Sequence, residues 1–444
     1  MPTRRRFLQG IAALGAASAC KSSKDSNTDT GIEKMRSLEP PVWEPEGIVD
    51  EQIFPYGIQV GDVSDVSAVI SIHSTMEQVN WTVVQQKNMS WEQVQQSTED
   101  VQDAHLHFEL DDLEEDSAYC ICAFGIDGKR STVTRFRTAL AASAERIVVF
   151  GATSCLGGNL PWPNLTVASA EKLDFFCLLG DTVYADGAQI YDQYWTYWNR
   201  TLSQQGFKDL TSSTSLIATW DDHEVSNNWN PETIPTDKFI SALTAFRNAL
   251  PQQVGIDGNI WRKLSWGEVL DLFVLDCRSE RLSGDYVSQE QLLWLKEGLQ
   301  SSTAQWKVIL NSVPITDLSG LLGNAQSDDR WQGYPEQRTE LLQSIEDSGV
   351  SNVLWISGDF HHGLIAKLAP EQELGSSMYE VLTGPSGSFI NPIGELLVPS
   401  EQFIYGHSQW SYTRFEINPF ERNVTIQFVG DDGEVFHSFL LNGD

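Results

Sequence analysis

The chain has 444 residues, of which 41% are hydrophobic and 20% charged, a composition typical of a globular protein with two or three domains. Its 29 Lys and Arg residues face 61 Asp and Glu residues, which gives a formal net charge of −32 at pH 7. This charge repels nucleic acids and anionic membrane surfaces, so we expect neither as a binding partner.

The first 20 residues resemble an export signal. Residues 3–9 read TRRRFLQ, like the twin-arginine signal, and the apolar run that follows is too short to span a bilayer. Residues 17–20 read ASAC, which resembles a lipoprotein cleavage box with Cys20 as the lipidation site. Residues 21–45 are typical of a flexible tether. We therefore expect twin-arginine export of a lipoprotein anchored in the periplasm or on the cell surface, whose only membrane contact is its lipid.

Residues 46–140 predict a small N-terminal β-sandwich domain that resembles a fibronectin domain. The expected strands are short, alternating or β-branched, and separated by turn residues. His105 and His107 fall in one of them, and we interpret both as ordinary strand residues. The candidate strands read SAVISIHS, VNWTVVQQ, AHLHFEL, SAYCICAFG and STVTRFRTA.

From residue 145 to residue 444 apolar runs of strand length alternate with helical stretches, and strands return near the end of the chain. Nearly continuous hydrophobicity indicates strands that are covered on both faces. Helices are predicted at 237–250 and in SQEQLLWLKEGLQ, where Ser288 is a candidate cap. The apolar runs span 147–150, 175–179, 216–219, 270–275, 308–310 and 353–356.

Polar residues follow these runs where each strand is expected to end. The carboxyl ends of strands in an open α/β sheet meet at one crevice, so these side chains can converge. Crowded carboxylates repel one another unless a cation neutralises them, and a multinuclear metal site is the simplest explanation. Thiolate and phenolate ligands suit a metal such as ferric iron, whereas carboxylate and amide oxygens suit a hard divalent ion. The residues in question are Cys155, Asp181, Tyr184, Asp222, His223, Asn227, Asn311, Asp359 and His361.

Successive blocks of the chain resemble the alkaline phosphatase D (PhoD-type) family of the calcineurin-like metallophosphatase superfamily. The blocks occur in order as SC, GDTVYAD, WDDHEVSNN, LDCRSER, QEQLLWL, WQGYPEQR and SGDFHH, after an entry segment FPYGIQVGD. The resemblance implies an α/β (α+β) fold in which a four-layer αββα metallophosphatase sandwich follows the β-domain. It also implies hydrolysis of phosphoesters by a centre of iron (Fe³⁺) and calcium (Ca²⁺), with other divalent metals remaining open.

The resemblance also implies roles for individual residues. Asp181 would be the bridging carboxylate, and Cys155 and Tyr184 would ligate iron. The remaining metal ligands would be Asp222, Asp359 and His361.

Four further positions have roles that the resemblance leaves less defined. His223 resembles the histidine that steadies the substrate or protonates the leaving group, and we take it as the catalytic residue. Asn311 stands where relatives have a metal-binding histidine. Asn227 and Arg278 are further candidates for metal or substrate binding, although a structural ion-pair cluster explains Arg278 equally well.

The sequence thus predicts an exported, monomeric alkaline phosphatase or phosphodiesterase that uses metal ions to activate water for attack on phosphorus. Its substrate would be a small or polymeric phosphoester. Two alternatives stay open. One is a phospholipase D-type phosphodiesterase that acts on lipid or polymer headgroups, and the other is a non-catalytic surface binding protein on a phosphatase scaffold.

Overall fold

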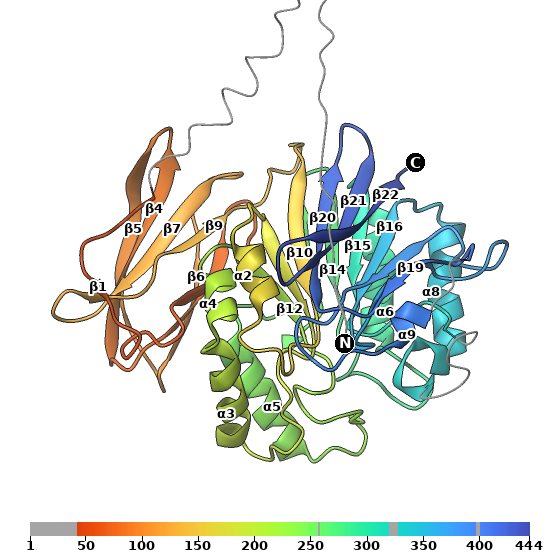
Figure 1. Ribbon diagram of the computed structural model, residues 1–444, viewed down its shortest axis with the longest axis horizontal. Helices are drawn as coiled ribbons and strands as arrows, with labels where there is room; N and C mark the ends of the chain where they lie inside the picture. Colours follow the sequence, from red (N-terminus) through yellow and green to blue (C-terminus); the bar gives the residue numbers. More distant parts are fainter. Residues whose placement is uncertain (1–41, 256–257, 319–326, 397–399) are drawn as a thin grey trace, which may run out of the picture.

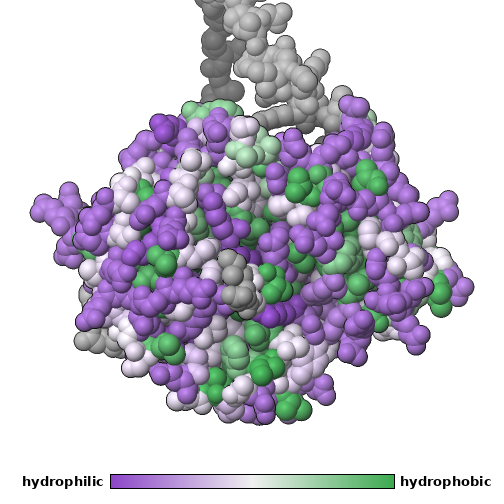
Figure 2. Space-filling model, turned by 180° about the vertical axis from the view of Figure 1, so that it is seen from behind, coloured by the Kyte–Doolittle hydropathy of each residue, from purple (hydrophilic) through white to green (hydrophobic). Residues whose placement is uncertain are grey.

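The computed structural model describes residues 42–255, 258–318, 327–396 and 400–444 (Figure 1). The predicted export signal, the lipidation residue Cys20 and nearly all of the predicted tether lie outside the described residues. Within the described ranges no helix is both long enough and apolar enough to cross a membrane. Figure 2 shows a face on which hydrophilic side chains predominate, as the net charge leads one to expect.

Two large sheets form the centre of the molecule. The first has nine strands in the order β22-β21-β20-β10-β11-β12-β2-β3-β6, and the second has seven in the order β13-β14-β15-β16-β18-β17-β19. The strands of the first sheet are β2 (Ile58–Gly61), β3 (Ala68–His73), β6 (His105–Leu110), β10 (Val148–Thr153), β11 (Phe175–Leu179), β12 (Ser215–Thr219), β20 (Ser411–Asn418), β21 (Asn423–Gly430) and β22 (Val435–Asn442). Those of the second are β13 (Arg262–Trp266), β14 (Leu270–Val274), β15 (Trp306–Leu310), β16 (Val353–Ser357), β17 (Gly363–Lys367), β18 (Tyr379–Leu382) and β19 (Phe403–His407).

The two sheets pack face to face, and helices cover their outer faces. One hydrophobic core joins Phe150 and Phe175 of the first sheet to Leu272 and Val308 of the second. Separate cores lie between each sheet and its own helices, whose positions beside the sheets can be followed in Figure 1. The first sheet is covered by α2 (Pro163–Ser169), α3 (Tyr191–Leu202), α4 (Gln205–Thr211) and α5 (Thr236–Ala249), and the second by α6 (Gln289–Ser301) and α8 (Pro335–Asp347). The predicted four-layer αββα sandwich is therefore confirmed.

Sequence patterns also predicted the positions of the strands and the helix cap near the site. The run at 175–179 coincides with β11, and the runs at 216–219, 270–275, 308–310 and 353–356 match strands to within two residues. Ser288 caps α6 as predicted, because its side-chain oxygen accepts a hydrogen bond from the backbone N–H of Gln291 at 3.1 Å. The remaining short elements are η2 (Ser327–Asp329), η3 (Trp331–Gly333) and α9 (Ile393–Leu396).

The N-terminal segment forms a β-sandwich of which one sheet continues into the first central sheet. A six-stranded sheet packs its apolar face on β2 and β3, and β2 pairs in parallel with β12 at Gly61 and Leu216. Gly61 permits this approach because a Cβ there would lie 2.9 Å from the carbonyl oxygen of Leu216 and 2.0 Å from that of Pro251. His105 and His107 lie on β6. The six-stranded sheet comprises β1 (Ile48–Val49), β4 (Gln78–Lys87), β5 (Ser90–Asp100), β7 (Ala118–Phe124), β8 (Lys129–Arg130) and β9 (Thr134–Arg137).

Candidate metal centre

The ends of β10, β11 and β16 bring four different ligand atoms together. The Sγ of Cys155 lies 3.5 Å from Asp181 Oδ2, and the phenolic hydroxyl of Tyr184 donates to the same oxygen at 3.2 Å. The Tyr184 hydroxyl also lies 3.2 Å from Nε2 of His361, which is itself 3.8 Å from Asp181 Oδ2. Sulfur, phenol, imidazole and carboxylate therefore share one small volume, which we call the sulfur pole.

Carboxylates gather on the other side of Asp181. One oxygen each from Asp221, Asp222 and Asp359 lie within 4.8 Å of one another, and ligand atoms of Asp181, Asp222 and His223 form a second such group. These residues follow β11, β12 and β16, so both central sheets contribute. We call this group the carboxylate pole, and Asp181 belongs to both poles.

Arg278 lies behind the carboxylate pole and is fully buried. Its guanidinium donates to both oxygens of Asp221, at 2.7 and 2.9 Å, and to Asp329 Oδ1 at 2.5 Å. The same guanidinium lies 3.9 Å from Asp222 and 3.7 Å from Asp359. Of the two interpretations of Arg278, the geometry favours the structural ion-pair cluster, because the carboxylates occupy its donors.

Four of the predicted ligands have left-handed backbone conformations. Positive φ angles occur at Cys155 (56°), Asp181 (53°), Asp359 (66°) and His361 (56°). A residue with a Cβ rarely adopts this region, and such strain persists only where the surrounding structure enforces it. Each strand therefore ends in a sharp turn that directs its side chain toward the other ligands.

The turn at Asp181 depends on Gly180, which lies close to Asp221, and on Glu224, which holds the backbone of the turn. Gly180 has φ of 87°, and a Cβ there would lie 2.4 Å from the Cβ of Asp221. The buried carboxylate of Glu224 accepts from the backbone N–H groups of Asp181 (3.1 Å), Thr182 (2.6 Å) and Asp221 (2.9 Å). Glu224 thus ties the ends of β11 and β12 together and acts as a positioning residue.

The donor set fits metal ions. Among the described residues, Asp181 Oδ1, Asp222 Oδ1 and His361 Nδ1 are buried without a hydrogen-bond partner. Burial and the neighbouring Asp222 raise the pKa of Asp181 well above its usual range, and burial and Asp221 do the same to the pKa of Asp359. A cation would reverse these shifts and satisfy the lone pairs, and sulfur with phenolic oxygen suits a softer ion than carboxylates do.

His223 is held at the edge of the carboxylate pole. Its Nδ1 lies 2.8 Å from Asp186 Oδ1, and its ring centroid is 4.3 Å from that of Tyr184. Burial alone would lower the pKa of His223, but the bond to Asp186 and the charges of Asp181 and Asp222 raise it to about 10. The charged imidazole is therefore favoured beside these carboxylates, and the contact of Nδ1 with Asp186 leaves Nε2 on the other side of the ring.

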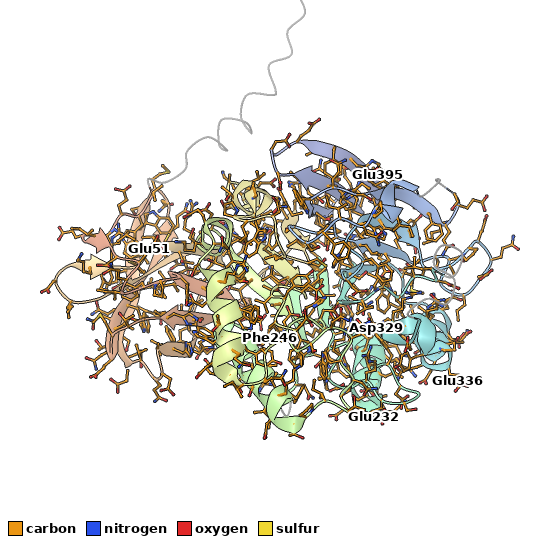
Figure 3. All side chains as sticks on the ribbon, turned by 60° about the horizontal axis from the view of Figure 1, so that its bottom comes forward. Glu51, Glu232, Phe246, Asp329, Glu336 and Glu395 are labelled. Carbon is orange, nitrogen blue, oxygen red and sulfur yellow. The ribbon has the colours of Figure 1, made fainter. Side chains whose placement is uncertain are left out.

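A cavity of about 250 Å³ opens over the carboxylate pole and reaches His361 of the sulfur pole. Among the predicted residues it is lined by Asp222, His223, Asn227, Asp359 and His361. A second cavity of about 570 Å³ adjoins it through shared Asn228 and Asp329, and its wall includes Glu232. Figure 3 labels Asp329 and Glu232 on the side of the molecule where α8 lies.

Of the two asparagines predicted from the sequence, one lies elsewhere than expected. Asn311 is buried, and its carboxamide oxygen accepts from Cys277 Sγ at 2.8 Å and from Trp331 Nε1 at 3.1 Å. Its nitrogen donates to the carbonyl of Val313, so the side chain is fully used within the core. Asn227 does reach the cavity, and its backbone N–H donates to Asp186 at 2.6 Å.

Sequence reasoning missed several residues of the cavity wall. The side-chain carboxamide of Asn228, turned so that its nitrogen faces acceptors, donates to Asp222 Oδ2 at 2.9 Å and to Asp329 Oδ2 at 3.2 Å. Phe389 is 73% exposed, with its ring centroid 4.2 Å from that of His361. Asn228 and Phe360 lie inside the blocks WDDHEVSNN and SGDFHH, and Asp329 and Arg330 directly precede the block WQGYPEQR, so their place in or beside these blocks was the available signal. The others that line the wall are Phe360 and Asn391.

Comparison with known proteins agrees with this architecture. The family model described as PhoD-like phosphatase matches residues 150–410. The chain belongs to the PhoD-like phosphatase family. It is 26% identical over 259 residues to alkaline phosphatase D of Bacillus subtilis (strain 168), an alignment that covers 47% of this chain and 44% of that protein. The matched part is thus less than half of the length of this relative.

Two solved structures share the fold of this PhoD-like chain. A structure of PhoD superposes with a TM-score of 0.76 and 20% identity, covering 88% of this chain and 89% of the other. Purple acid phosphatase PPD1 from yellow lupin (Lupinus luteus) seeds gives a TM-score of 0.64 at 13% identity, covering 88% and 75%. At these identities the likeness establishes the fold alone.

We predict that Asp181→Asn lowers metal content and activity together, because Asp181 belongs to both poles. Loss of a ligand should exceed the 10- to 100-fold effect that is typical of its hydrogen-bonded neighbours. Elemental analysis of protein purified without chelator, with a phosphoester assay, measures both. The control is Asp192→Asn, which removes an exposed carboxylate in the first turn of α3. Full metal content in an inactive Asp181→Asn variant would contradict the ligand assignment.

Proposed function

We propose that this chain is a metal-dependent phosphoester hydrolase. The observation that carries the proposal is that the sulfur pole and the carboxylate pole share Asp181 at the strand ends of two packed sheets, beside a cavity that Asp222, Asp359 and His361 line. A protein with a net charge of −32 repels an anionic ester, so cations in this cavity are needed before such a substrate can bind. Membership of the PhoD-like phosphatase family supports the same reaction.

The residues of each pole suggest which ions they would hold. Cys155, Tyr184, His361 and Asp181 would hold iron (Fe³⁺), since thiolate and phenolate donors suit it. Asp222 and Asp359 would hold calcium (Ca²⁺) or another hard divalent ion, with Asp181 shared between the sites. When bound, such ions supply Lewis-acid activation of water and of the phosphoryl oxygens.

His223 would complete the reaction by giving its Nε2 proton to the leaving oxygen. Asp186 accepts from Nδ1 at 2.8 Å, which fixes the ring and favours its charged form. The carbonyl oxygen of His223 accepts from the backbone N–H of Ala185 at 2.9 Å, so the loop that carries Tyr184 also positions this histidine.

We expect the purified protein to hydrolyse p-nitrophenyl phosphate or bis-p-nitrophenyl phosphate. The variant His223→Ala tests whether His223 protonates the leaving group or only positions the substrate. General acid catalysis is worth about 10²–10⁴-fold, and a poor leaving group depends on it most. The variant should therefore lose activity on alkyl phosphoesters and much less on p-nitrophenyl esters, while keeping its metals.

The same assay discriminates among the functions. A phospholipase D-type enzyme would hydrolyse the diester and not the monoester, and a non-catalytic binding protein would hydrolyse neither. Equal losses in His223→Ala on both kinds of leaving group would point to substrate positioning, and loss of metal would make His223 a ligand.

Iron in the sulfur pole would give the protein a visible colour. A phenolate bound to ferric iron produces a charge-transfer band, so we expect this band to vanish or shift in Tyr184→Phe. Tyr197→Phe, a substitution of an exposed tyrosine on α3, is the matched control. A colourless and fully active wild-type protein would contradict iron and favour hard ions at both poles.

We also infer that the protein is exported and anchored through Cys20, because the arginine run, short apolar run and cleavage box occur in the expected order. Cys20→Ser should then move the protein from the membrane fraction to the soluble fraction, as measured by fractionation and immunoblotting. Ser18→Ala, which leaves the cysteine in place, is the control. A Cys20→Ser protein that still pellets with membranes would disprove the anchor.

A further inference from the structure

Three arginines approach the site cavity, and two of them are neutralised by carboxylates. Arg278 is paired with Asp221 and Asp329. Arg281 donates to Asp329 at 2.8 Å and to the carbonyl of Trp229 at 2.6 Å. Arg330 is the third, and it is the only arginine or lysine among the described residues that line the cavity.

Arg330 is held by neutral groups. Its Nε and Nη2 donate to Oε1 of Gln332 at 3.2 and 3.0 Å, and its guanidinium lies 5.4 Å from the ring centroid of Phe360. Across the described ranges it forms no ion pair, and its Nη1 has no hydrogen-bond partner. These contacts fix one edge of the guanidinium and leave the other edge for a ligand.

Burial of the Arg330 charge is energetically unfavourable unless an anion binds to it. Arg330 is only 2% exposed, and burial of a charged group without a counter-ion is unfavourable. Burial accordingly lowers the pKa of Arg330, whereas the charges of Asp359, Asp329 and Asp317 act in the opposite direction. Asp359 belongs to the carboxylate pole, so a metal ion there would withdraw its compensation and increase the need for an anion.

We propose that Arg330 binds a terminal oxygen of the substrate phosphoryl group and thereby selects phosphomonoesters over phosphodiesters. This inference rests on the proposed hydrolase function. In alkaline solution a monoester has two negative charges and three terminal oxygens, whereas a diester has one charge and two such oxygens. A guanidinium edge donates charge-assisted hydrogen bonds to phosphate, and it gains more from the dianion than from the monoanion.

The test compares kcat/KM for p-nitrophenyl phosphate with kcat/KM for bis-p-nitrophenyl phosphate in metal-loaded protein. Arg330→Gln should lower the monoester-to-diester ratio by about tenfold or more, the usual size of a lost charged hydrogen bond. Arg330→Lys should restore part of the ratio, because it returns the charge without the planar edge. The control Arg200→Gln removes a charge from the exposed end of α3 and should leave the ratio unchanged.

Binding of inorganic phosphate to the metal-loaded protein, measured by calorimetry, provides a second readout. Arg330→Gln should weaken it by a similar factor, with metal content unchanged. If Arg330 variants fail to fold, Gln332→Leu keeps the charge but releases the guanidinium, and the ratio should still fall. An unchanged ratio in an active enzyme, or unchanged phosphate affinity, overturns the assignment of Arg330. A wild-type protein that hydrolyses neither ester instead overturns the proposed function.

Discussion

Repulsion among the carboxylates at the strand ends is the constraint on which the rest of the site depends. Asp181, Asp221, Asp222 and Asp359 lie close together, and the first three are buried while Asp359 is partly exposed in the cavity. Arg278 neutralises the group from behind, and its donors are occupied by Asp221 and Asp329. The charge on the open side of the group remains uncompensated, so the folded protein favours protonation of Asp181 and Asp359 or the arrival of cations. Metal binding and the ionisation of these ligands are therefore one linked equilibrium.

The fold sustains this repulsion because the strands behind the ligands are anchored in apolar cores. Residues of β11, β12, β14, β15 and β16 are buried along their whole length, and the two sheets share one core between them. Strained turns at Cys155, Asp181, Asp359 and His361 can be maintained at the ends of such strands, since unwinding them would disrupt the packing. Glu224 adds three backbone hydrogen bonds at the junction of β11 and β12. The packing of the two sheets thus holds the ligand side chains in position at the strand ends.

Much of this could be predicted from the sequence, because apolar runs and the residues that follow them are local features. The strand of 175–179 and the capped helix after Ser288 depend on patterns within a few residues. Pairing partners that are distant in sequence were not predictable. Asn311 follows an apolar run as the ligands do, yet Cys277 and Trp331 occupy its oxygen. Arg278 and Arg330 look alike in the sequence, and only the fold shows that carboxylates surround the first while Gln332 holds the second.

The N-terminal sandwich contributes to the site because strands of the sandwich belong to the first central sheet. β2 extends the first central sheet beyond β12, so it covers the edge of the strand whose end carries Asp222. Asp62, directly after β2, is fully buried and accepts from Arg262 of the second sheet at 2.6 and 2.7 Å. Removing either partner would leave an unpaired charge in the interior, which is far more costly than losing a surface ion pair. One buried ion pair therefore joins the sandwich to both central sheets, and the positions of the strand ends depend on all three.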